Sequence, residues 1–318
     1  MILWLLALAL PDCASCHAAI AAAYAKTPMA QSSGPVTSLP PGSFRHDPSQ
    51  TTYTVSPPNR VSIRTPQQSA AQALDYFIGS GSHGRSYLFR RAGKLFQAPV
   101  THYTQRGWAM SPGYEADDHS DWTRPIDRNC LWCHASSTRL IFGSVNQYAD
   151  PPFAENGITC ARCHGDAREH ARDPRQLPVQ PAKLAPAARA DVCRQCHQLG
   201  LTRTDKPGRS FFEYRPGALL DRLVTYHTAP QQLASDLKVT GHFERLAMSR
   251  CQIASGDRLW CGTCHNPHPA VASDLNQPCR TCHTPAVCRR GSDCQSCHMP
   301  KAPSPEAAHS VFTDHWIR

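Results

Sequence analysis

The sequence predicts a mainly α-helical fold with much irregular coil and one small subdomain that contains a β-hairpin. A Cys-x-x-Cys-His motif, which fits about one helical turn, recurs seven times in the 318 residues. The chain contains 28 Pro and 18 Gly, and long stretches have no hydrophobic period. Alternating apolar runs, which indicate strands, occur in the region between the first two motifs.

Each motif has the residues that attach a c-type haem. Its two thiols bond to the vinyl groups of the porphyrin, and the His that follows becomes the proximal ligand of the iron. Zinc sites and thiol redox motifs also use Cys-x-x-Cys, but neither needs a His directly after the second Cys. We therefore expect seven covalently bound haem c groups. Sites 1 to 7 are Cys13, Cys16 and His17; Cys130, Cys133 and His134; Cys160, Cys163 and His164; Cys193, Cys196 and His197; Cys261, Cys264 and His265; Cys279, Cys282 and His283; and Cys294, Cys297 and His298.

Seven haems in a chain of this length make the fold haem-templated. With one porphyrin per about 45 residues, the cofactors supply much of the buried apolar surface, and we expect the chain not to fold without them. Residues 11–318 are expected to form a single multihaem cytochrome unit. Within it, residues 31–128 form a β-containing insert and residues 129–318 a haem array.

The first ten residues, MILWLLALAL, are apolar and too short to span a bilayer. They resemble the hydrophobic region of a secretory signal that lacks its basic start, and a buried strand or helix is the alternative. Because haem c is attached outside the cytoplasm in bacteria, we expect an exported protein of the periplasm or extracellular surface.

Several elements follow from local patterns. Site 1 opens an Ala-rich helix that runs to about Lys26 and is stopped by Pro28. Residues 51–55 and 60–64 alternate as strands do, and residues 87–97 predict a hairpin around a Gly turn. Leu219, Leu220, Leu223, Val224 and His227 follow a helical spacing, and a second helix is expected to carry His242, Leu246 and Cys251.

Distal ligands decide the chemistry of each haem. An iron with two strong protein ligands passes electrons, whereas an iron with one can bind a small molecule. Seven of the 17 His are proximal, and the ten that remain are enough for all seven irons. The alternatives for each are a surface, propionate-bonding or core role. The candidate distal ligands are His170, His268, His83, His315, His227, His309 and Met29, with His46, His102, His119 and His242 as further histidines.

Two cysteines remain outside the motifs, Cys251 and Cys288. In an exported protein they can form a disulfide, and two free buried thiols are the alternative.

The formal net charge of +9 does not indicate nucleic-acid binding. Each ferric haem with ionised propionates carries about −1 and each ferrous haem about −2, so seven haems bring the charge to about +2 or about −5. The expected partners are redox proteins, with self-assembly into a filament or a membrane-associated complex as a further expectation.

Several segments resemble the exported multihaem cytochromes often fused to tetratricopeptide repeats, and more distantly the tetrahaem electron acceptor of hydroxylamine oxidoreductase. This resemblance implies mostly bis-His haems in closely stacked pairs and a role in electron transfer. Met29 stands where related patterns often have a His. The segments are residues 77–88 (FIGSGSHGRSYL), 108–114 (WAMSPGY), 163–165 (CHG) with His170, 249–251 (SRC), 264–268 (CHNPH) and 297–300 (CHMP).

Three functions are consistent with these features. The first is a heptahaem cytochrome that transfers single electrons between respiratory partners, which is a carrier rather than an enzyme. The second is a reductase or oxidase of a small nitrogen or sulfur compound at one five-coordinate haem; no motif has Lys in place of its proximal His, as resemblance to the nitrite reductases requires. The third is a filament subunit, in which His309 or His315 caps a haem of the neighbouring chain.

Overall fold

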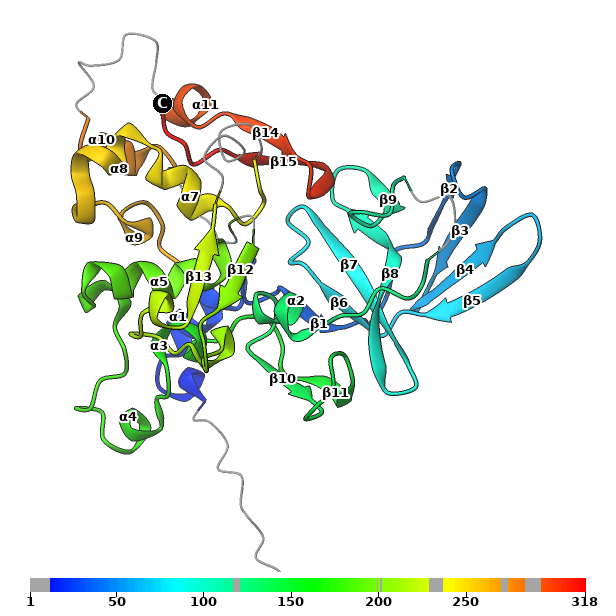
Figure 1. The fold of residues 1–318 in the computed structure, drawn as a ribbon, viewed down its shortest axis with the longest axis horizontal. Helices are drawn as coiled ribbons and strands as arrows, with labels where there is room; N and C mark the ends of the chain where they lie inside the picture. Colours follow the sequence, from blue (N-terminus) through cyan, green and yellow to red (C-terminus); the bar gives the residue numbers. More distant parts are fainter. Residues whose placement is uncertain are drawn as a thin grey trace, which may run out of the picture.

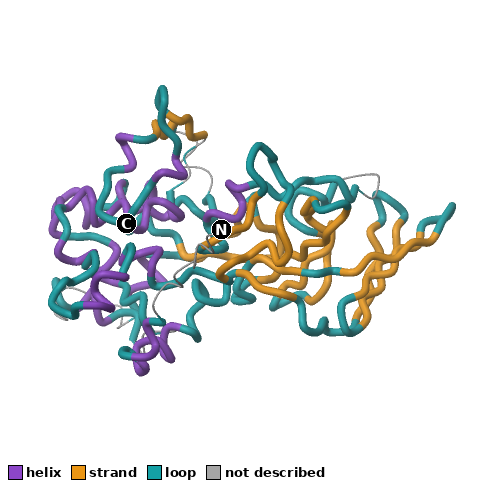
Figure 2. Tube along the Cα trace, turned by 90° about the horizontal axis from the view of Figure 1, so that it is seen from below, coloured by secondary structure: helices purple, strands orange, loops and turns teal. Residues whose placement is uncertain are grey.

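The computed structural model describes residues 12–116, 121–198, 200, 202–228, 237–269, 274–283 and 293–318. These residues form two unlike halves, one made of strands and the other of short helices and loops (Figures 1 and 2). Strands β1 to β9 build the first half, and six of the seven motifs lie in the second half with site 2 close to the border (Figure 1). The predicted signal segment, His119 and Cys288 lie outside the described residues.

Two antiparallel sheets make up the strand half. One has the order β1-β6-β7-β8-β9 and the other the order β2-β3-β4-β5. The alternating runs and the hairpin predicted from the sequence are confirmed as β3, β4 and the β7–β8 pair. The strands are β1 (Ser33–Pro35), β2 (Gly42–His46), β3 (Thr51–Ser56), β4 (Arg60–Arg64), β5 (Ser69–Ala73), β6 (Tyr76–Ile78), β7 (Gly84–Arg91), β8 (Lys94–Tyr103) and β9 (Gly107–Met110).

The strand half has a hydrophobic core of its own between the two sheets. Every second residue of β3 and β4 points inward, which buries Tyr53 and Val61, while β7 and β9 contribute Phe89 and Trp108. Burial of this much apolar surface is the main favourable term in folding, and it needs no porphyrin here.

The other half is built from short helices. The longest described one, α5, has 12 residues and ends on the site 4 motif. The described helices are α1 (Ala18–Tyr24), α2 (Arg128–Trp132), α3 (Ala161–His164), α4 (Arg168–Arg172), α5 (Pro186–His197), α7 (His242–Ala247), α8 (Arg250–Ser255), α9 (Cys261–Cys264), α10 (Gln277–Arg280) and α11 (Cys294–His298). The Ala-rich helix predicted after site 1 is confirmed as α1, and the second predicted helix is broken at Ser249 into α7 and α8.

Three two-stranded sheets complete the fold. They pair β10 (Ser137–Leu140) with β11 (Tyr148–Glu155), β12 (Thr202–Asp205) with β13 (Val224–His227), and β14 (Lys301–Ser304) with β15 (Ala307–Thr313). The last of these hairpins extends from the helical half toward β9 (Figure 1). There the His83 ring lies 4.4 Å from the Phe312 ring, and the Tyr103 ring lies 5.1 Å from the His309 ring.

The prediction of a mainly α fold is wrong. The chain is 26% helix and 29% strand, with five sheets and ten short helices among the described residues. The motifs form helical turns as expected, but most of these turns end after four or five residues. A helix needs an apolar face to bury, and in this half the segments between motifs are short and rich in Pro, so they run as loops and hairpins.

The helix predicted from Leu219 to His227 is also wrong. A single 3-10 turn at Leu220–Arg222 is followed by β13, which pairs with β12. Leu220, Leu223 and Val224 are buried, so the spacing identified core residues correctly. Over nine residues, however, the same apolar pattern fits a turn followed by a strand as well as a helix.

Candidate functional site

Each motif folds into a turn that brings its three functional side chains to one side. The amide of His17 donates to the carbonyl of Cys13 at 2.8 Å, and the amide of His164 donates to Cys160 at 2.9 Å. The same bond closes the motifs of His265 and His283, both at 2.9 Å. Residues three and four apart lie on one face of such a turn. The two thiols and the imidazole therefore share a face, as attachment of one planar porphyrin requires.

The motifs are also close to one another. Thiols of different motifs lie close enough for one to raise the pKa of the other, which places site 1 near site 3, site 2 near site 4, site 4 near site 5, and site 6 near site 7. The pairs are Cys13 with Cys160, Cys133 with Cys196, Cys193 with Cys261, and Cys279 with Cys294. Cys163 also raises the pKa of Cys196, and Cys279 that of Cys264, after the larger effect of burial, which places site 3 near site 4 and site 5 near site 6. All seven motifs thus form one connected cluster.

Three motif histidines lie opposite a second imidazole at nearly the same separation. The ring centroids of His17 and His170 are 6.1 Å apart, with planes 11° from parallel. Those of His164 and His268 are 6.1 Å apart at 28°. Those of His265 and His315 are 6.0 Å apart at 34°. The predicted residues His170, His268 and His315 are therefore each placed opposite a motif histidine from a distant part of the chain.

A fourth pair involves His242, which sequence reasoning ranked behind other histidines. Its ring centroid lies 5.2 Å from that of His197 and 4.4 Å from that of His315. His242 is the first residue of α7, and no local pattern distinguishes it from a core histidine. The signal that identifies it is its place beside two other imidazoles, which only the folded chain shows.

Hydrogen bonds orient several of these rings. The Nδ1 atom of His164 lies 2.8 Å from the carbonyl oxygen of Val179, and that of His315 lies 3.1 Å from the carbonyl oxygen of Thr313. The Nδ1 atom of His268 lies 3.1 Å from the side-chain oxygen of Asn266. Metal-binding histidines commonly donate one ring N–H to an oxygen in this way, which leaves the other nitrogen for the metal. In these rings the nitrogen left available is Nε2.

Burial keeps the clustered imidazoles neutral. It lowers the pKa of His134 to about 4 and that of His197 to about 4. Burial, with the neighbouring His315, His197 and His265, lowers the pKa of His242 to about 2. Since the neutral imidazole is the form that binds a metal, these rings are ready to act as ligands at physiological pH.

The other predicted ligands lie elsewhere. His83 and His309 pack against aromatic rings where the β14–β15 hairpin meets the strand half. The Nε2 atom of His227, on the exposed side of β13, lies 2.9 Å from the Thr204 hydroxyl. The Met29 carbonyl oxygen lies 2.8 Å from the Ser32 hydroxyl, which is also 2.8 Å from the carbonyl oxygen of His134, so Met29 lies beside site 2.

Among the further histidines, both ring nitrogens of His46 have partners, the Ser49 hydroxyl at 2.8 Å and the Glu115 carbonyl oxygen at 2.9 Å. His102 packs on Trp108 in the strand half. Cys251 is half-buried on α8; the proposed disulfide partner, Cys288, is not among the described residues.

Large apolar side chains stay exposed around the motifs. Ile20 follows His17 on α1 and is 53% exposed, and Ile253 on α8 is 71% exposed. Leu177 and Leu275, which precede Val179 and Cys279, are 60% and 50% exposed.

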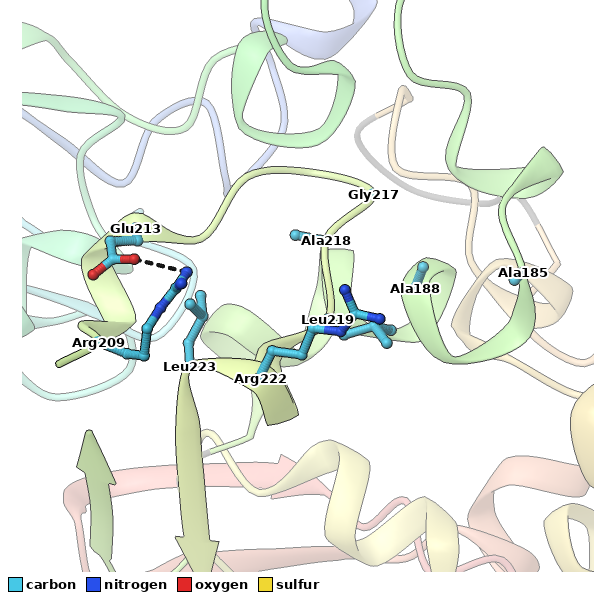
Figure 3. A pocket seen from close by; sticks show the side chains of 9 residues that line it. All are labelled: Ala185, Ala188, Arg209, Glu213, Gly217, Ala218, Leu219, Arg222 and Leu223. Atoms are coloured by element: carbon cyan, nitrogen blue, oxygen red, sulfur yellow. Dashed lines mark ion pairs between the residues drawn. The ribbon is translucent and has the colours of Figure 1, made fainter. Parts of the chain in front are cut away.

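A cavity of about 500 Å³ lies alongside the first turns of α5, the helix that ends in site 4. Figure 3 shows its wall of Ala188, Leu219 and Leu223, with the Arg222 side chain at its edge. Arg209 is held on the opposite side by an ion pair with Glu213 at 2.8 Å (Figure 3). An apolar wall with guanidinium groups at its rim suits an apolar group that carries carboxylates.

Comparisons with known proteins identify the fold. No protein-family model matches the chain, and no curated protein does. The crystal structure of the outer cell wall cytochrome OcwA is similar to this structure with a TM-score of 0.62 and 16% sequence identity, over 96% of this chain and 78% of that chain. The two proteins therefore share a fold along nearly the whole of this chain. The resemblance to the cytochromes fused to tetratricopeptide repeats, and to the acceptor of hydroxylamine oxidoreductase, is not confirmed by these comparisons. No helix in the described ranges combines the length and apolar character needed to cross a bilayer.

Proposed function

We propose that the chain is a heptahaem c-type cytochrome that transfers single electrons between redox partners in the periplasm or at the cell surface. When bound, haem c supplies a one-electron couple whose potential depends on its axial ligands and surroundings. The fold shared with an outer cell wall cytochrome supports this function and an exported location.

The observation that carries the proposal is the spacing of the three imidazole pairs. A bond from a metal to an imidazole nitrogen is about 2.0–2.1 Å, so two imidazoles on opposite sides of one metal have ring centroids about 6 Å apart. The pairs of His17, His164 and His265 have separations of 6.1, 6.1 and 6.0 Å. We therefore assign His170, His268 and His315 as distal ligands at sites 1, 3 and 5. At site 4 the His242 ring is nearer to His197, with centroids 5.2 Å apart and the two Nδ1 atoms 3.1 Å apart, which is the spacing of a direct hydrogen bond and not of two ligands of one metal.

The residues around these imidazole pairs are also consistent with bound haem. At site 3 both rings have their Nδ1 atoms bound by oxygens, so both Nε2 atoms are available for one iron. Ile20, on the helix that follows site 1, is exposed, as is Ile253 on α8, and a bound porphyrin could cover such side chains. The cavity beside α5 suits a porphyrin edge, with Arg209 and Arg222 as partners for its propionates.

The thiol contacts also define an order for the sites. They lead from site 1 to site 3, then to sites 4, 5, 6 and 7, with site 2 joined at site 4. Site 4 is thus the junction of the array. Haems attached to adjoining motifs are near neighbours, as the hopping of single electrons requires.

Haem content is the direct test. The mass of the purified protein is expected to exceed that of its processed polypeptide by seven haems, and electron paramagnetic resonance of the oxidised protein is expected to be dominated by low-spin ferric haem. A mass equal to that of the bare polypeptide would contradict the proposal.

Removal of site 4 is expected to interrupt electron flow. A Cys193→Ala/Cys196→Ala variant loses one haem at the junction, and conductance across a protein monolayer should fall well below that of the native protein. The matched control, Cys294→Ala/Cys297→Ala, also loses one haem, but at the end of the order, and should conduct more than the junction variant. Equal conductance in the two variants would show that site 4 is not the junction.

One observation favours the reductase or oxidase function as a second candidate. His134 is half-buried, and within the described ranges it has no opposing imidazole of the kind that faces His17, His164 and His265. Met29 lies beside site 2, and an iron there that Met29 does not ligate would have an open position for a small nitrogen or sulfur compound. Binding of nitric oxide to the ferrous native protein, lost in the Cys130→Ala/Cys133→Ala variant, would support this function.

The filament function has less support from His315. Its ring faces His265 of the same chain, so it is engaged within the molecule rather than offered to a neighbour.

A further inference from the structure

The C-terminal segment is tied to α7 by a buried ion pair. The Nε atom of Arg245 donates to Oδ1 of Asp314 at 2.8 Å, and its Nη2 atom donates to Oδ2 at 2.8 Å. The two side chains are 5% and 3% exposed. Such a bidentate hydrogen bond fixes the relative orientation of the two side chains as well as their distance.

The pair connects two elements that each carry a clustered histidine, His242 beside site 4 and His315 opposite His265. Arg245 follows His242 by three residues on α7, so the two share a helix face. Asp314 directly precedes His315. The His315 ring lies between two others, 4.4 Å from His242 and 6.0 Å from His265. A small rotation of the segment would therefore change which iron His315 can reach.

Other contacts hold the same segment. The β14–β15 pairing continues to Thr313, and the amide of Asp314 donates to the carbonyl oxygen of Pro300 at 3.1 Å. The Ser249 hydroxyl donates to the carbonyl oxygen of His315 at 2.7 Å and accepts from the amide of Ile317 at 2.8 Å. Arg318 approaches Asp314 at 3.4 Å from the surface, with its side chain 54% exposed. These contacts involve the backbone or an exposed side chain, whereas the bidentate contact of Arg245 joins two buried side chains.

A buried ion pair contributes little net stability, because the loss of hydration offsets the attraction between the charges. The effect of the Arg245–Asp314 pair is instead to fix one arrangement of α7 and the C-terminal segment. We propose that Arg245 and Asp314 are a positioning pair that directs His315 to the iron of site 5 and keeps it from His197 and His242 at site 4. This inference rests on the bis-His ligation proposed above.

The test compares the holoproteins of Asp314→Asn and Arg245→Met with the native protein. Each is expected to keep all its haems by mass, while about one haem in seven changes from low-spin to high-spin or shows altered g-values. Added imidazole should return the high-spin fraction to low-spin, which a purely structural role does not explain. The control is Arg318→Met, which removes the exposed guanidinium from the same carboxylate and should leave the spectrum unchanged.

Stability is separated from positioning by a double variant. Arg245→Met/Asp314→Leu replaces the charges with apolar groups and should restore the melting temperature toward that of the native protein while the spectrum stays altered. If the single variants yield no holoprotein, Arg245→Lys is the alternative. It keeps the positive charge but cannot form the bidentate hydrogen bond to Asp314, and it is expected to show a partial spectral change. Native spectra in every variant that folds would overturn the inference. His268→Ala tests bis-His ligation separately, at site 3. If that variant also shows no high-spin haem, it is the proposed bis-His ligation that is wrong.

Discussion

Replacing His268 with alanine is expected to convert one low-spin haem of the oxidised protein to high-spin and to leave the other six unchanged. His268 faces His164 at a centroid separation of 6.1 Å, and both rings have their Nδ1 atoms bound to oxygens. Loss of this imidazole leaves the site 3 iron with one protein ligand and an open position. Electron paramagnetic resonance would detect the change, and the visible spectrum should show binding of cyanide at that iron.

The chain offers a matched control for this substitution. His227 was also a predicted distal ligand, but its ring contacts the Thr204 hydroxyl on the exposed side of β13. His227→Ala should therefore keep the native spectrum. A high-spin haem in His227→Ala, or none in His268→Ala, would contradict the assignment of the distal ligands.

A chain expressed without haem attachment is expected to fold in one half only. The two sheets of the strand half enclose a core that includes Tyr53, Phe89, Val100 and Trp108, all buried without any porphyrin. The helical half has a smaller core around Trp132 and leaves Ile20 and Ile253 exposed. Without covalent haem, that half lacks the apolar surface that offsets the entropy of ordering its loops.

Limited proteolysis of the haem-free chain measures this difference. A resistant fragment within residues 31–116 should remain, with strand-type circular dichroism, while the segments from residue 160 onward are degraded. The holoprotein under the same conditions should resist cleavage in both halves. Equal resistance of the two halves without haem would show that the porphyrins are not the core of the helical half.

Local patterns predicted the strand half well. The alternation of residues 51–55 and 60–64, and the Gly turn near residue 93, correspond to β3, β4 and the β7–β8 hairpin. These succeed because strand faces and tight turns are decided by neighbouring residues. The mainly α expectation failed because the helical turns of the motifs were extended into whole helices. The segment from Leu219 to His227 failed because its apolar spacing also suits a turn and a strand.

The amino-acid sequence by itself determined where covalent haem can attach, because the attachment chemistry depends on five consecutive residues. These residues are close together in the chain whatever the tertiary structure. It also indicated that histidines were plentiful enough to serve as second ligands. Which histidine faces which motif was decided only by the tertiary structure. His164 and His268 are more than a hundred residues apart, as are His17 and His170, and no local pattern records such a meeting. The packing of distant segments places the ring centroids of each pair 6.1 Å apart, which is the separation expected for two imidazoles that bind one metal. The pairing is therefore a property of the folded chain.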